Sequence, residues 1–330
     1  MDVLKTAVPS QLPTTLTLDK QEPSLSSALH NTIVECIGNT PLVRIPFNTP
    51  AHCYAKLEYF NPGGSIKDRS AAYMIEQAEK AGLQPGGTII EASSGNQGIA
   101  TAMIGRAKGY RVIITVSDKV SLEKRTTLMA YGAEVVTCPA TALLSDPKSY
   151  HSVALEVQNS TPNSFMLNQY FNPDNAAAHY YSLGPEIWHQ TNGLITHFIA
   201  AAGSGGTVSG AGKYLKEQNP AITVIGVDAA TSYRATCGDP KPYAIEGMGV
   251  DYDTPLIDAT VIDQFINVTD ADAFAMLKTL ARTYGILVGP PSGAVAAAAA
   301  SYVPSLPECA VVVMIFGDSG KSYLTKHFYD

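Results

Sequence analysis

A lysine stands where a turn is predicted to pass into a helix, within residues 61–69 (Asn-Pro-Gly-Gly-Ser-Ile-Lys-Asp-Arg). Asn-Pro-Gly-Gly favours a turn, and Ser65 with Asp68 three residues later is typical of a helix N-cap and its capping box. The next residues favour a helix that ends at Gly82. Lys67 is therefore expected in the first helical turn, where the helix dipole and unpaired N–H groups disfavour an ammonium. A neutral amine can form a Schiff base with an aldehyde, whereas the alternative is an ordinary solvated surface lysine.

A glycine-rich segment follows a predicted strand over residues 195–202 and precedes a predicted helix over 208–218. Glycines let the backbone wrap around an anion, and hydroxyl and N–H groups at a helix start can bind a phosphate. The alternative is a glycine-rich turn that serves packing alone. The candidate phosphate-binding residues are Gly203, Ser204, Gly205, Gly206 and Thr207.

Polar residues gather at a second strand-to-helix junction, residues 91–98 (Glu-Ala-Ser-Ser-Gly-Asn-Gln-Gly). Hydroxyls, amides and N–H groups at a helix start suit a carboxylate or a phenolate oxygen, although a plain serine N-cap has the same pattern. Residues 168–173 predict a polar turn, and residues 289–293 (Gly-Pro-Pro-Ser-Gly) predict another turn that opens a helix. These segments contain Ser93, Ser94, Gly95, Asn96, Gln97, Gln169, Tyr170 and Ser292.

The combination of these sites indicates one cofactor. An activated lysine, one phosphate site and a separate carboxylate site together match pyridoxal 5′-phosphate. A nicotinamide dinucleotide is disfavoured because Val208 replaces the last glycine of G-x-G-x-x-G. A Walker A loop before Gly320 is also disfavoured, because Ile315 stands where that motif needs glycine.

The composition describes an enzyme-like globular chain of 330 residues, with 45% hydrophobic and 15% charged residues. A net charge of −7 disfavours nucleic acid and anionic membranes as partners. The five cysteines are far apart and form no C-x-x-C, which favours reduced thiols in the cytoplasm. The seven histidines form no H-E-x-x-H pair, so no metal site is expected. No apolar run reaches the ~20 residues that span a bilayer.

The order of the predicted elements indicates an α/β fold with parallel sheets covered on both faces, in which ligands lie beyond the carboxyl ends of the strands. Residues 1–31 are rich in Ser, Thr, Pro and Leu and are expected to form a flexible N-terminal extension. Strands are predicted over residues 88–92, 111–116, 134–137, 195–202, 223–228 and 309–316. Helices are predicted over residues 66–81, 97–108, 122–131, 175–190, 208–218, 270–284, 291–303 and 319–328.

With these motifs, the sequence from about Ile33 to Asp330 resembles the cystathionine β-synthase and cysteine synthase family of pyridoxal-phosphate enzymes, fold type II. The resemblance implies two three-layer αβα domains with parallel sheets, similar to the tryptophan synthase β fold. Residues 32–60 with 177–330 would form the larger, phosphate-binding domain. Residues 61–176 would form the smaller domain, which carries the lysine and the carboxylate-binding loop. The family's regulatory domain pair would begin where this sequence ends, so that pair is expected to be absent.

The resemblance also implies roles for the motif residues. Lys67 would carry the cofactor as an imine, Asn96 would bond the ring hydroxyl, and the loop from Gly203 to Thr207 would hold the phosphate. The substrate carboxylate would be held by the loop at Ser93, Ser94, Gly95 and Gln97 with Gln169 and Tyr170. Gly247 would also contact the substrate. Tyr170, and the run of residues 246–252 that contains Gly247 (Glu-Gly-Met-Gly-Val-Asp-Tyr), look more like the cystathionine β-synthase branch.

Two residues depart from the family pattern. Gln97 stands where the family has threonine, so the carboxylate pocket is expected to be reshaped. Pro291 stands where the family has the serine that bonds the pyridine nitrogen, and proline has no side-chain donor. Three outcomes remain open: Ser292 shifts into place, Asp318 approaches, or the nitrogen has no protein partner.

The expected function is β-replacement on L-serine or an O-activated L-serine with a thiol nucleophile, in sulfur amino-acid metabolism. Cystathionine β-synthase-like activity is the first expectation, O-acetylserine sulfhydrylase activity is the alternative, and a non-catalytic cofactor-binding relative is the second alternative. The resemblance also implies small-molecule amino-acid substrates and a homodimer.

Overall fold

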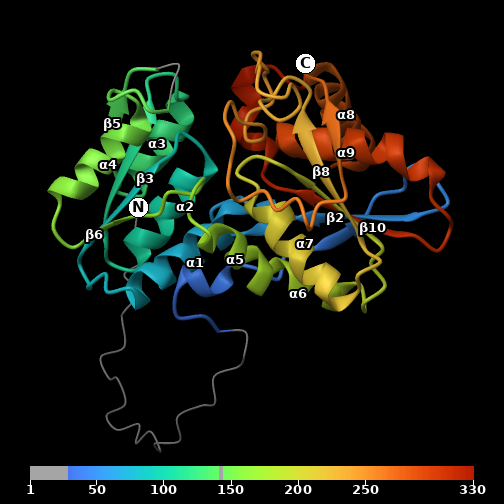
Figure 1. Ribbon diagram of the computed structural model, residues 1–330, viewed down its shortest axis with the longest axis horizontal. Coiled ribbons are helices and arrows are strands. Elements are labelled where there is room, and N and C mark those ends of the chain that lie inside the picture. The colour runs from blue at the N-terminus through green and yellow to red at the C-terminus, as the bar shows by residue number, and fades with distance from the viewer. Residues whose placement is uncertain (1–28, 141–143) are drawn as a thin grey trace, which may run out of the picture. The chain divides into compact units, whose positions relative to one another are not determined.

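The computed structural model describes residues 29–140 and 144–330 (Figure 1). Residues Thr32–Asp330 form one compact unit, and residues 1–31 are a separate unit. The extension predicted over residues 1–31 lies almost entirely outside the described residues. In the described part of the chain, no helix is both long and apolar enough to cross a membrane.

The larger of the two sheets has six strands, and all but one neighbouring pair run parallel. The exception is β1, which pairs antiparallel with β2 at the edge of the sheet. The inner strands are apolar and buried, as expected for strands covered by helices on both faces. In spatial order the strands are β1 (Leu42–Arg44), β2 (His52–Leu57), β10 (Val311–Phe316), β7 (His197–Ala201), β8 (Thr223–Ala229) and β9 (Gln264–Val268).

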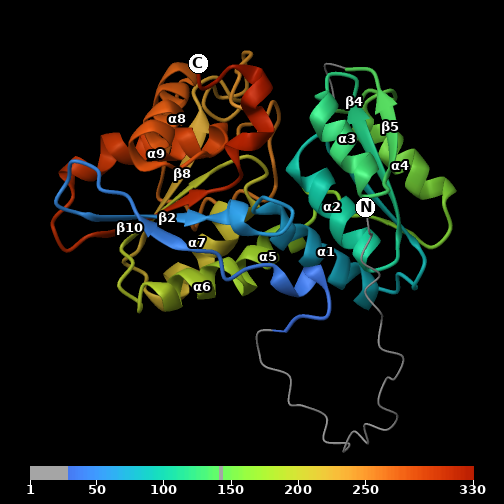
Figure 2. The same cartoon turned by 180° about the vertical axis from the view of Figure 1, so that it is seen from behind.

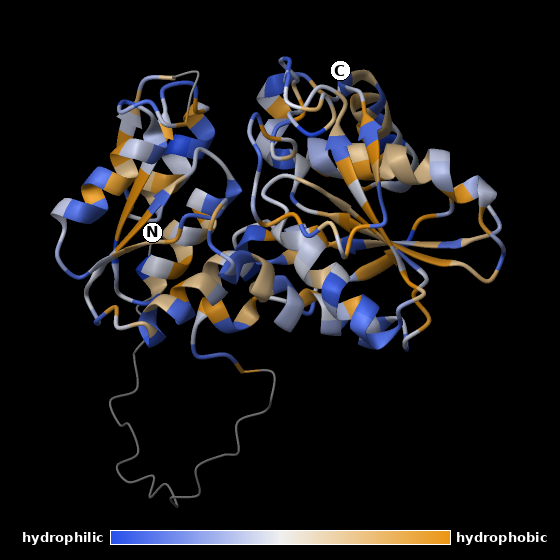
Figure 3. Cartoon of the chain, in the orientation of Figure 1, coloured by the Kyte–Doolittle hydropathy of each residue, from blue (hydrophilic) through white to orange (hydrophobic). Residues whose placement is uncertain are grey.

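Two groups of helices cover the faces of this sheet (Figures 1 and 2). On one face, α9 (Pro290–Tyr302) packs on the strands and α8 (Asp270–Tyr284) packs on α9. On the other face, α7 (Gly206–Gln218) packs on β7 and β8, and α6 (Leu183–Gln190) packs on α7. Each face has its own apolar core. In Figure 3 the strands between these helices are mainly hydrophobic.

The smaller sheet has four parallel strands within residues 88–166. The helix α2 (Asn96–Ala107) covers one face together with α3 (Leu122–Ala130), and α4 (Tyr150–Ser160) covers the other. Both sheets therefore have helices on both faces, which confirms the predicted α/β class. The strands in spatial order are β5 (Glu134–Cys138), β4 (Arg111–Ser117), β3 (Thr88–Ala92) and β6 (Ser164–Met166).

Two helices connect these layers. The helix α1 (Lys67–Lys80) packs against α2 of the smaller sheet and against α5 (Asp174–Tyr181), and α5 in turn packs against α7. Figures 1 and 2 both show α1 and α5 between the two sheets. Lys67 therefore begins a helix whose surroundings come from both sheets.

Several predicted elements differ from the observed ones. The single helix predicted over residues 175–190 is wrong: α5 and α6 are separate helices, divided at Ser182. Pro185 explains the division, because its ring and missing N–H are tolerated in the first turn of α6 but would interrupt a continuous helix. The last predicted helix is a 3-10 segment, Gly320–Lys326. Three other 3-10 segments span Ile33–Cys36, Glu58–Phe60 and Val303–Ser305. The elements β1, β2, α4, β6 and β9 had not been predicted.

Candidate active site

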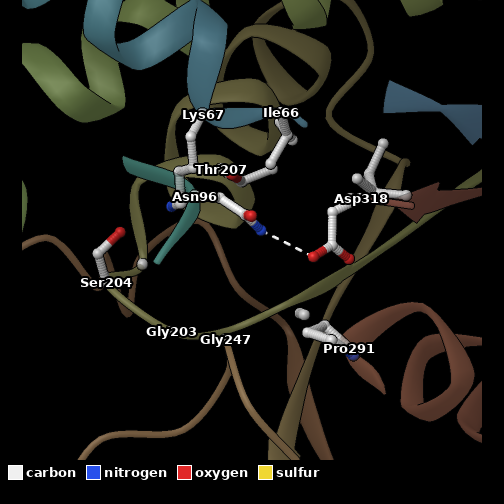
Figure 4. A pocket seen from close by; sticks show the side chains of 13 residues that line it. Ile66, Lys67, Asn96, Gly203, Ser204, Thr207, Gly247, Pro291 and Asp318 are labelled. Atoms are coloured by element: carbon white, nitrogen blue, oxygen red, sulfur yellow. Dashed lines mark hydrogen bonds between the residues drawn. The ribbon is translucent and has the colours of Figure 1, made fainter. Parts of the chain in front are cut away.

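An inner pocket lies at the carboxyl ends of β7 and β10, beside the first turns of α1, α2 and α9 (Figure 4). Its position agrees with the rule that ligands of parallel α/β sheets lie beyond the strand ends. Among the residues predicted from the sequence, those lining it are Lys67, Asn96, Gly203, Ser204, Gly205, Thr207 and Gly247. The other lining residues are Ile66, Ala201, Pro291, Ile315, Gly317 and Asp318.

An outer pocket adjoins the inner one, and the residues that line both are Lys67, Asn96, Gly203, Ser204 and Gly247. The outer pocket contains every residue predicted to bind the substrate: Ser93, Ser94, Gly95, Gln97, Gln169, Tyr170 and Gly247. Of all the predicted site residues, Gly206 and Ser292 alone line neither pocket. The structure therefore brings the two main motif groups together around one lysine.

Lys67 is partly exposed, and it opens to both pockets. Burial among its neighbours lowers the pKa of its amine to about 8, while the charges of Glu91 and Asp318 act in the opposite direction. Burial, which the sequence could not reveal, thus adds to the expected effect of the helix start. About half of such an amine is neutral near pH 8, so it can act as a nucleophile or a base under mild conditions.

This pKa gives a testable pH dependence. The rate at which the cofactor-free protein forms an imine with a small aldehyde should rise as the pH increases towards 8 and should level off above it. The sign follows because only the neutral amine attacks, and an ordinary lysine would level off near 10.4. Borohydride trapping followed by peptide mass spectrometry measures the rate at Lys67, and exposed Lys80 serves as an internal control. A midpoint near that of Lys80 would contradict this pKa.

The turn before α1 differs in detail from the predicted capping box. Ser65 Oγ accepts a hydrogen bond from the Lys67 N–H (3.2 Å), but the N-cap residue is Ile66, so the predicted serine N-cap is wrong. The Asp68 carboxylate, however, accepts from the Gly63 N–H (2.5 Å) and not from Ser65. A Cβ at position 63 would lie 2.4 Å from Asp68 Oδ1, which explains why the turn requires glycine there. The turn thereby fixes the backbone on both sides of Lys67.

A buried ion network anchors the first turn of α1. Arg69 Nε donates to Glu58 Oε2 (2.7 Å), and its Nη1 lies 2.9 Å from Glu186 Oε2. The buried ammonium of Lys56 bonds Glu186 and donates to the Thr40 carbonyl. These residues come from β2, the following 3-10 turn, α1 and α6. They therefore tie the start of α1, and with it Lys67, to the larger sheet.

The glycine loop runs from the end of β7 into the first turn of α7. Gly205 has φ +93°, and a Cβ there would lie 2.7 Å from Ile257 Cδ1, so both conformation and space exclude a side chain. Buried Ser204 accepts a hydrogen bond from Asn175 Nδ2 (3.0 Å). Gly206 faces Asn175 and not the pocket, because a Cβ there would lie 2.4 Å from the Asn175 oxygen. The loop therefore presents backbone and hydroxyl groups to the inner pocket at the start of a 13-residue helix.

The neighbour of Thr207 is a neutral histidine. Thr207 Oγ1 lies 3.2 Å from Nε2 of His179, a fully buried residue of α5. Burial, with smaller contributions from the charges of Lys67 and Arg69, holds the pKa of His179 well below its usual value. The histidine therefore orients the threonine hydroxyl without adding a charge to the pocket.

The Ser93–Gln97 loop offers unused donors to the outer pocket. Gln97 Oε1 accepts from Ser70 Oγ (2.9 Å), whereas its buried Nε2 has no hydrogen-bond partner. Ser94 Oγ accepts from the Ser117 N–H (3.0 Å), which leaves its hydroxyl proton for another acceptor. The Gln97 Nε2 is buried, so the Ser94 hydroxyl is the donor that remains available to an anion in this pocket. The predicted carboxylate role of this loop remains a prediction, and this donor suits it.

Glu91 is a site residue that the sequence analysis overlooked, because it reads as part of a buried strand. Its carboxylate accepts from the backbone N–H groups of Asn168 (2.7 Å) and Gln169 (3.4 Å). It therefore fixes the polar turn that presents Gln169 and Tyr170 to the outer pocket. Burial raises the pKa of Glu91 to about 8. The only sequence signal was an acidic residue inside an apolar strand.

Asp318 follows β10 and is held by two donors. Asn96 Nδ2 (2.7 Å) and Tyr323 OH (2.5 Å) both donate to Asp318 Oδ2. Its other oxygen, Oδ1, is buried and has no hydrogen-bond partner. Burial raises the pKa of this carboxyl. Figure 4 shows Asp318 between Asn96 and Pro291.

Three residues that line the outer pocket form a cluster of salt bridges. Lys124 of α3 bonds Glu246 (2.9 Å), and Lys326 near the C-terminus bonds the other oxygen of Glu246 (2.8 Å). Lys124 comes from the smaller sheet's helices, whereas Glu246 lies in the segment between β8 and β9. The cluster therefore spans the mouth of the site. Among the described residues no group of three or more His, Cys, Asp or Glu side chains could hold a metal ion.

Comparison with known proteins identifies the family. Residues 33–318 match the family described as "Pyridoxal-phosphate dependent enzyme". The chain is 42% identical to a cystathionine beta-synthase from Apis mellifera, over 89% of this chain and 60% of that protein. It is 39% identical to a cysteine synthase from Helicobacter pylori, over 90% of this chain and 98% of that protein. The chain thus spans only part of the length of the cystathionine beta-synthase.

Solved structures agree with this result. An O-acetylserine dependent cystathionine beta-synthase from Helicobacter pylori superposes with a TM-score of 0.85 at 38% identity, covering 92% of this chain and 99% of that one. An O-ureido-L-serine synthase superposes with a TM-score of 0.86 at 33% identity, covering 92% and 96%. Sequence and fold point to the same group, and this chain is a member of the pyridoxal-phosphate dependent enzyme family.

Proposed function

We propose that this chain catalyses β-replacement on L-serine or an O-activated L-serine, with a thiol as the incoming nucleophile. The observation behind the proposal is the position of Lys67. This residue lines both the inner pocket, with its glycine-rich loop, and the outer pocket, with the loop of residues 93–97. Cystathionine β-synthase-like activity is the first candidate. O-acetylserine sulfhydrylase activity is the alternative, because relatives of both names match the chain at about equal identity.

The inner pocket suits the family's cofactor. Lys67 would bind its aldehyde, Asn96 would bond its ring hydroxyl, and the loop of Gly203, Ser204, Gly205, Gly206 and Thr207 would hold its phosphate. Three features of this chain support that assignment: an amine with a lowered pKa, a loop whose glycine at 205 excludes a side chain, and a helix N-terminus at the end of that loop. When bound, pyridoxal 5′-phosphate supplies an electron sink that stabilises negative charge at the substrate's α-carbon.

The outer pocket would hold the amino-acid substrate by its carboxylate. The hydroxyls of Ser93 and Ser94 are the donors on one side, where Gly95 and Gln97 also line the pocket; the Gly95 N–H donates to Ser93 Oγ (3.2 Å). Gln169 and Tyr170 lie on the other side, on the turn that Glu91 fixes. Gln97, which replaces the family's threonine, lines this pocket, and Ser70 orients its amide by donating to Oε1. Two fixed sides would orient the substrate for reaction at Lys67.

Lys67 would act as the general base. An amine with a pKa of about 8 is sufficiently neutral near physiological pH to take the substrate's α-proton, and it would hold that proton at Nζ while the β-substituent leaves and the thiol adds. Burial makes this role favourable, because it penalises the charged amine before the proton is taken. Glu91 and Asp318 limit that penalty once Lys67 is charged.

We also propose a two-domain organisation around this site. Residues 61–176 contain all four strands of the smaller sheet, and residues 32–60 with 177–330 contain all six strands of the larger one. The Lys124–Glu246–Lys326 cluster would then join the domains across the outer pocket. Closure of the smaller domain would exclude water during the reaction.

Donor and acceptor specificity can be tested directly. The cofactor-loaded protein would be incubated with L-serine, O-acetyl-L-serine or O-phospho-L-serine, each with homocysteine or sulfide, and products would be identified by mass spectrometry. Cystathionine from homocysteine supports the first candidate, and cysteine from sulfide supports the alternative. A Lys67→Ala variant provides the blank. Cofactor binding without product from any pair would reject the enzyme proposal and favour a non-catalytic relative.

Family membership further suggests a homodimer in the cytoplasm. The five cysteines are all free in the structure, which is consistent with a reducing compartment. Light scattering on the purified protein would measure its mass, and a monomer at working concentration would reject the homodimer. Fractionation of cells that produce the protein would test its location.

A further inference from the structure

Asn175 is a buried side chain that bonds two separate loops of the candidate active site. It is the second residue of α5 and is fully buried. Its Nδ2 donates to the Gln169 carbonyl (2.7 Å), in the polar turn that lines the outer pocket, and to Ser204 Oγ (3.0 Å), in the glycine loop. The sequence analysis gave Asn175 no role, because nothing local links positions that lie 6 and 29 residues from it.

The direction of both hydrogen bonds is determined by the Gln169 carbonyl. A carbonyl can only accept, so the amide nitrogen of Asn175 must face it, and the same nitrogen then donates to Ser204. Ser204 Oγ also accepts a longer hydrogen bond from the Gly206 N–H (3.5 Å). Because both bonds are received by the serine oxygen, the hydroxyl proton of Ser204 is left for another acceptor.

Close packing of α5 on α7 holds Asn175 in place. Position 210 of α7 requires glycine, since a Cβ there would clash with the carbonyl of Ala176, the next residue of α5. At the start of α7, a Cβ at position 206 would clash with the Asn175 amide. Asn175 therefore lies directly against the helix that begins at the glycine loop, and a shift of its side chain would disturb that loop.

The polar turn is held by partners on two sides. Glu91 accepts from the N–H groups of Asn168 and Gln169, whereas Asn175 donates to the Gln169 carbonyl. Asn168 has φ +54°, a backbone conformation that is uncommon for residues other than glycine. Removing the Asn175 amide would leave the Gln169 carbonyl without this donor, so the turn that presents Gln169 and Tyr170 would be less firmly fixed.

One amide nitrogen thus joins the loop of the inner pocket to the turn of the outer pocket. We propose, on the basis of the proposed function, that Asn175 is a positioning residue that couples binding of the cofactor's phosphate to binding of the amino-acid substrate. An anion in the glycine loop would order Ser204 and, through Asn175, the turn that carries Gln169. Because such coupling is reciprocal, a substrate at the turn would also strengthen phosphate binding.

The first test uses wild-type, cofactor-free protein with inorganic phosphate, which has no ring or carboxylate that could bind the outer pocket. Amide hydrogen exchange would be measured by mass spectrometry, with α8 as the internal control. Phosphate should slow exchange both in residues 203–208 and in residues 167–172, and should leave α8 unchanged. Slower exchange at residues 203–208 alone would overturn this inference and leave the proposed function standing. No change at residues 203–208 would also overturn the phosphate site of the proposed function.

The second test is a double-mutant cycle between Asn175 and Ser204. Asn175→Ala should raise the Kd of pyridoxal phosphate about threefold to tenfold, as expected for one lost hydrogen bond. In a Ser204→Ala background the same substitution should change that Kd by less than about twofold, because its partner is already absent. Equal losses of affinity in the two backgrounds would overturn the proposed link through Ser204.

The same variants separate the two ends of the coupling. The Kd of L-serine for the cofactor-loaded protein, read from the change in visible absorbance, should rise on Asn175→Ala in both backgrounds, because the bond to Gln169 does not involve Ser204. An unchanged Kd for L-serine would overturn the proposed link to the turn. The matched control is Asn159→Ala, an exposed asparagine of α4, which should bind both ligands as the wild type does. The exchange measurement on the wild type does not depend on any variant folding.

Discussion

Replacing Lys67 with alanine is expected to lower turnover by at least about a thousandfold while the chain still folds. The loss follows because Lys67 is the only lysine that lines both the inner and the outer pocket among the described residues. The substitution would remove both the amine that binds the cofactor's aldehyde and the base that takes the α-proton. Folding should be retained, because burial opposes the charge that the substitution removes.

Three measurements would check this prediction. Turnover and the visible absorbance of lysine-bound cofactor should both disappear in Lys67→Ala, whereas the free energy of unfolding of the cofactor-free protein should change by less than about 1 kcal/mol. The matched control is Lys80→Ala, at the other end of α1, whose exposed side chain pairs with Glu76. The control should keep full activity. Turnover in Lys67→Ala close to that of the control would remove the basis of the proposed function.

Replacing Arg69 with alanine is expected to destabilise the fold by about 3–5 kcal/mol. Arg69 is 3% exposed and bonds both Glu58 and Glu186. The substitution leaves the Glu58 carboxylate fully buried without its main cation. Breaking one partner of a buried ion pair costs far more than breaking a surface pair, because the remaining charge cannot regain water.

The same network predicts that the wild-type protein loses stability at low pH. Burial raises the pKa of Glu58, but the Arg69 charge and hydrogen bond outweigh it and hold that pKa below its ordinary 4.5. A lowered folded-state pKa gives stability that is present above the unfolded value and is lost as the pH falls below it. In Arg69→Ala the pKa of the buried Glu58 should instead be raised. As the pH is lowered, the variant should therefore begin to lose stability at a higher pH than the wild type.

Urea unfolding of the cofactor-free protein at several pH values would measure both effects. The control is again Lys80→Ala, which breaks an exposed pair with Glu76 and should cost less than about 0.5 kcal/mol. A loss below about 1 kcal/mol in Arg69→Ala would mean that the ion network does not anchor α1.

Much of the fold, and the location of the candidate site, could be predicted from local patterns in the sequence. The continuous apolar strands of both sheets, and the helices that follow them, were predicted with bounds within two residues for β3, β4 and β8. The motif loops could be located because each lies between a strand and the helix after it, and parallel sheets bring such loops to one edge. Lys67 and the two loops that line the pockets could therefore be located without long-range information.

Contacts between distant segments could not be predicted in the same way. Asp318 meets Asn96 across 222 positions, and Glu91 meets Asn168 across 77. No local pattern encodes such pairs, so the sequence left three choices open for the group next to Pro291. The capping box at Ser65 was a plausible local pattern that a nearby alternative, the Gly63 N–H, displaced. The break between α5 and α6 had a local signal in Pro185 that was not used.

The central claim is a covalent link between pyridoxal phosphate and the amine of Lys67. The most direct measurement is reduction of the cofactor-loaded protein with borohydride, followed by protease digestion and peptide mass spectrometry. We predict a reduced pyridoxyl-phosphate adduct on the peptide that contains residues 61–69. A colourless protein that takes up no cofactor, or an adduct confined to other lysines, would contradict the account.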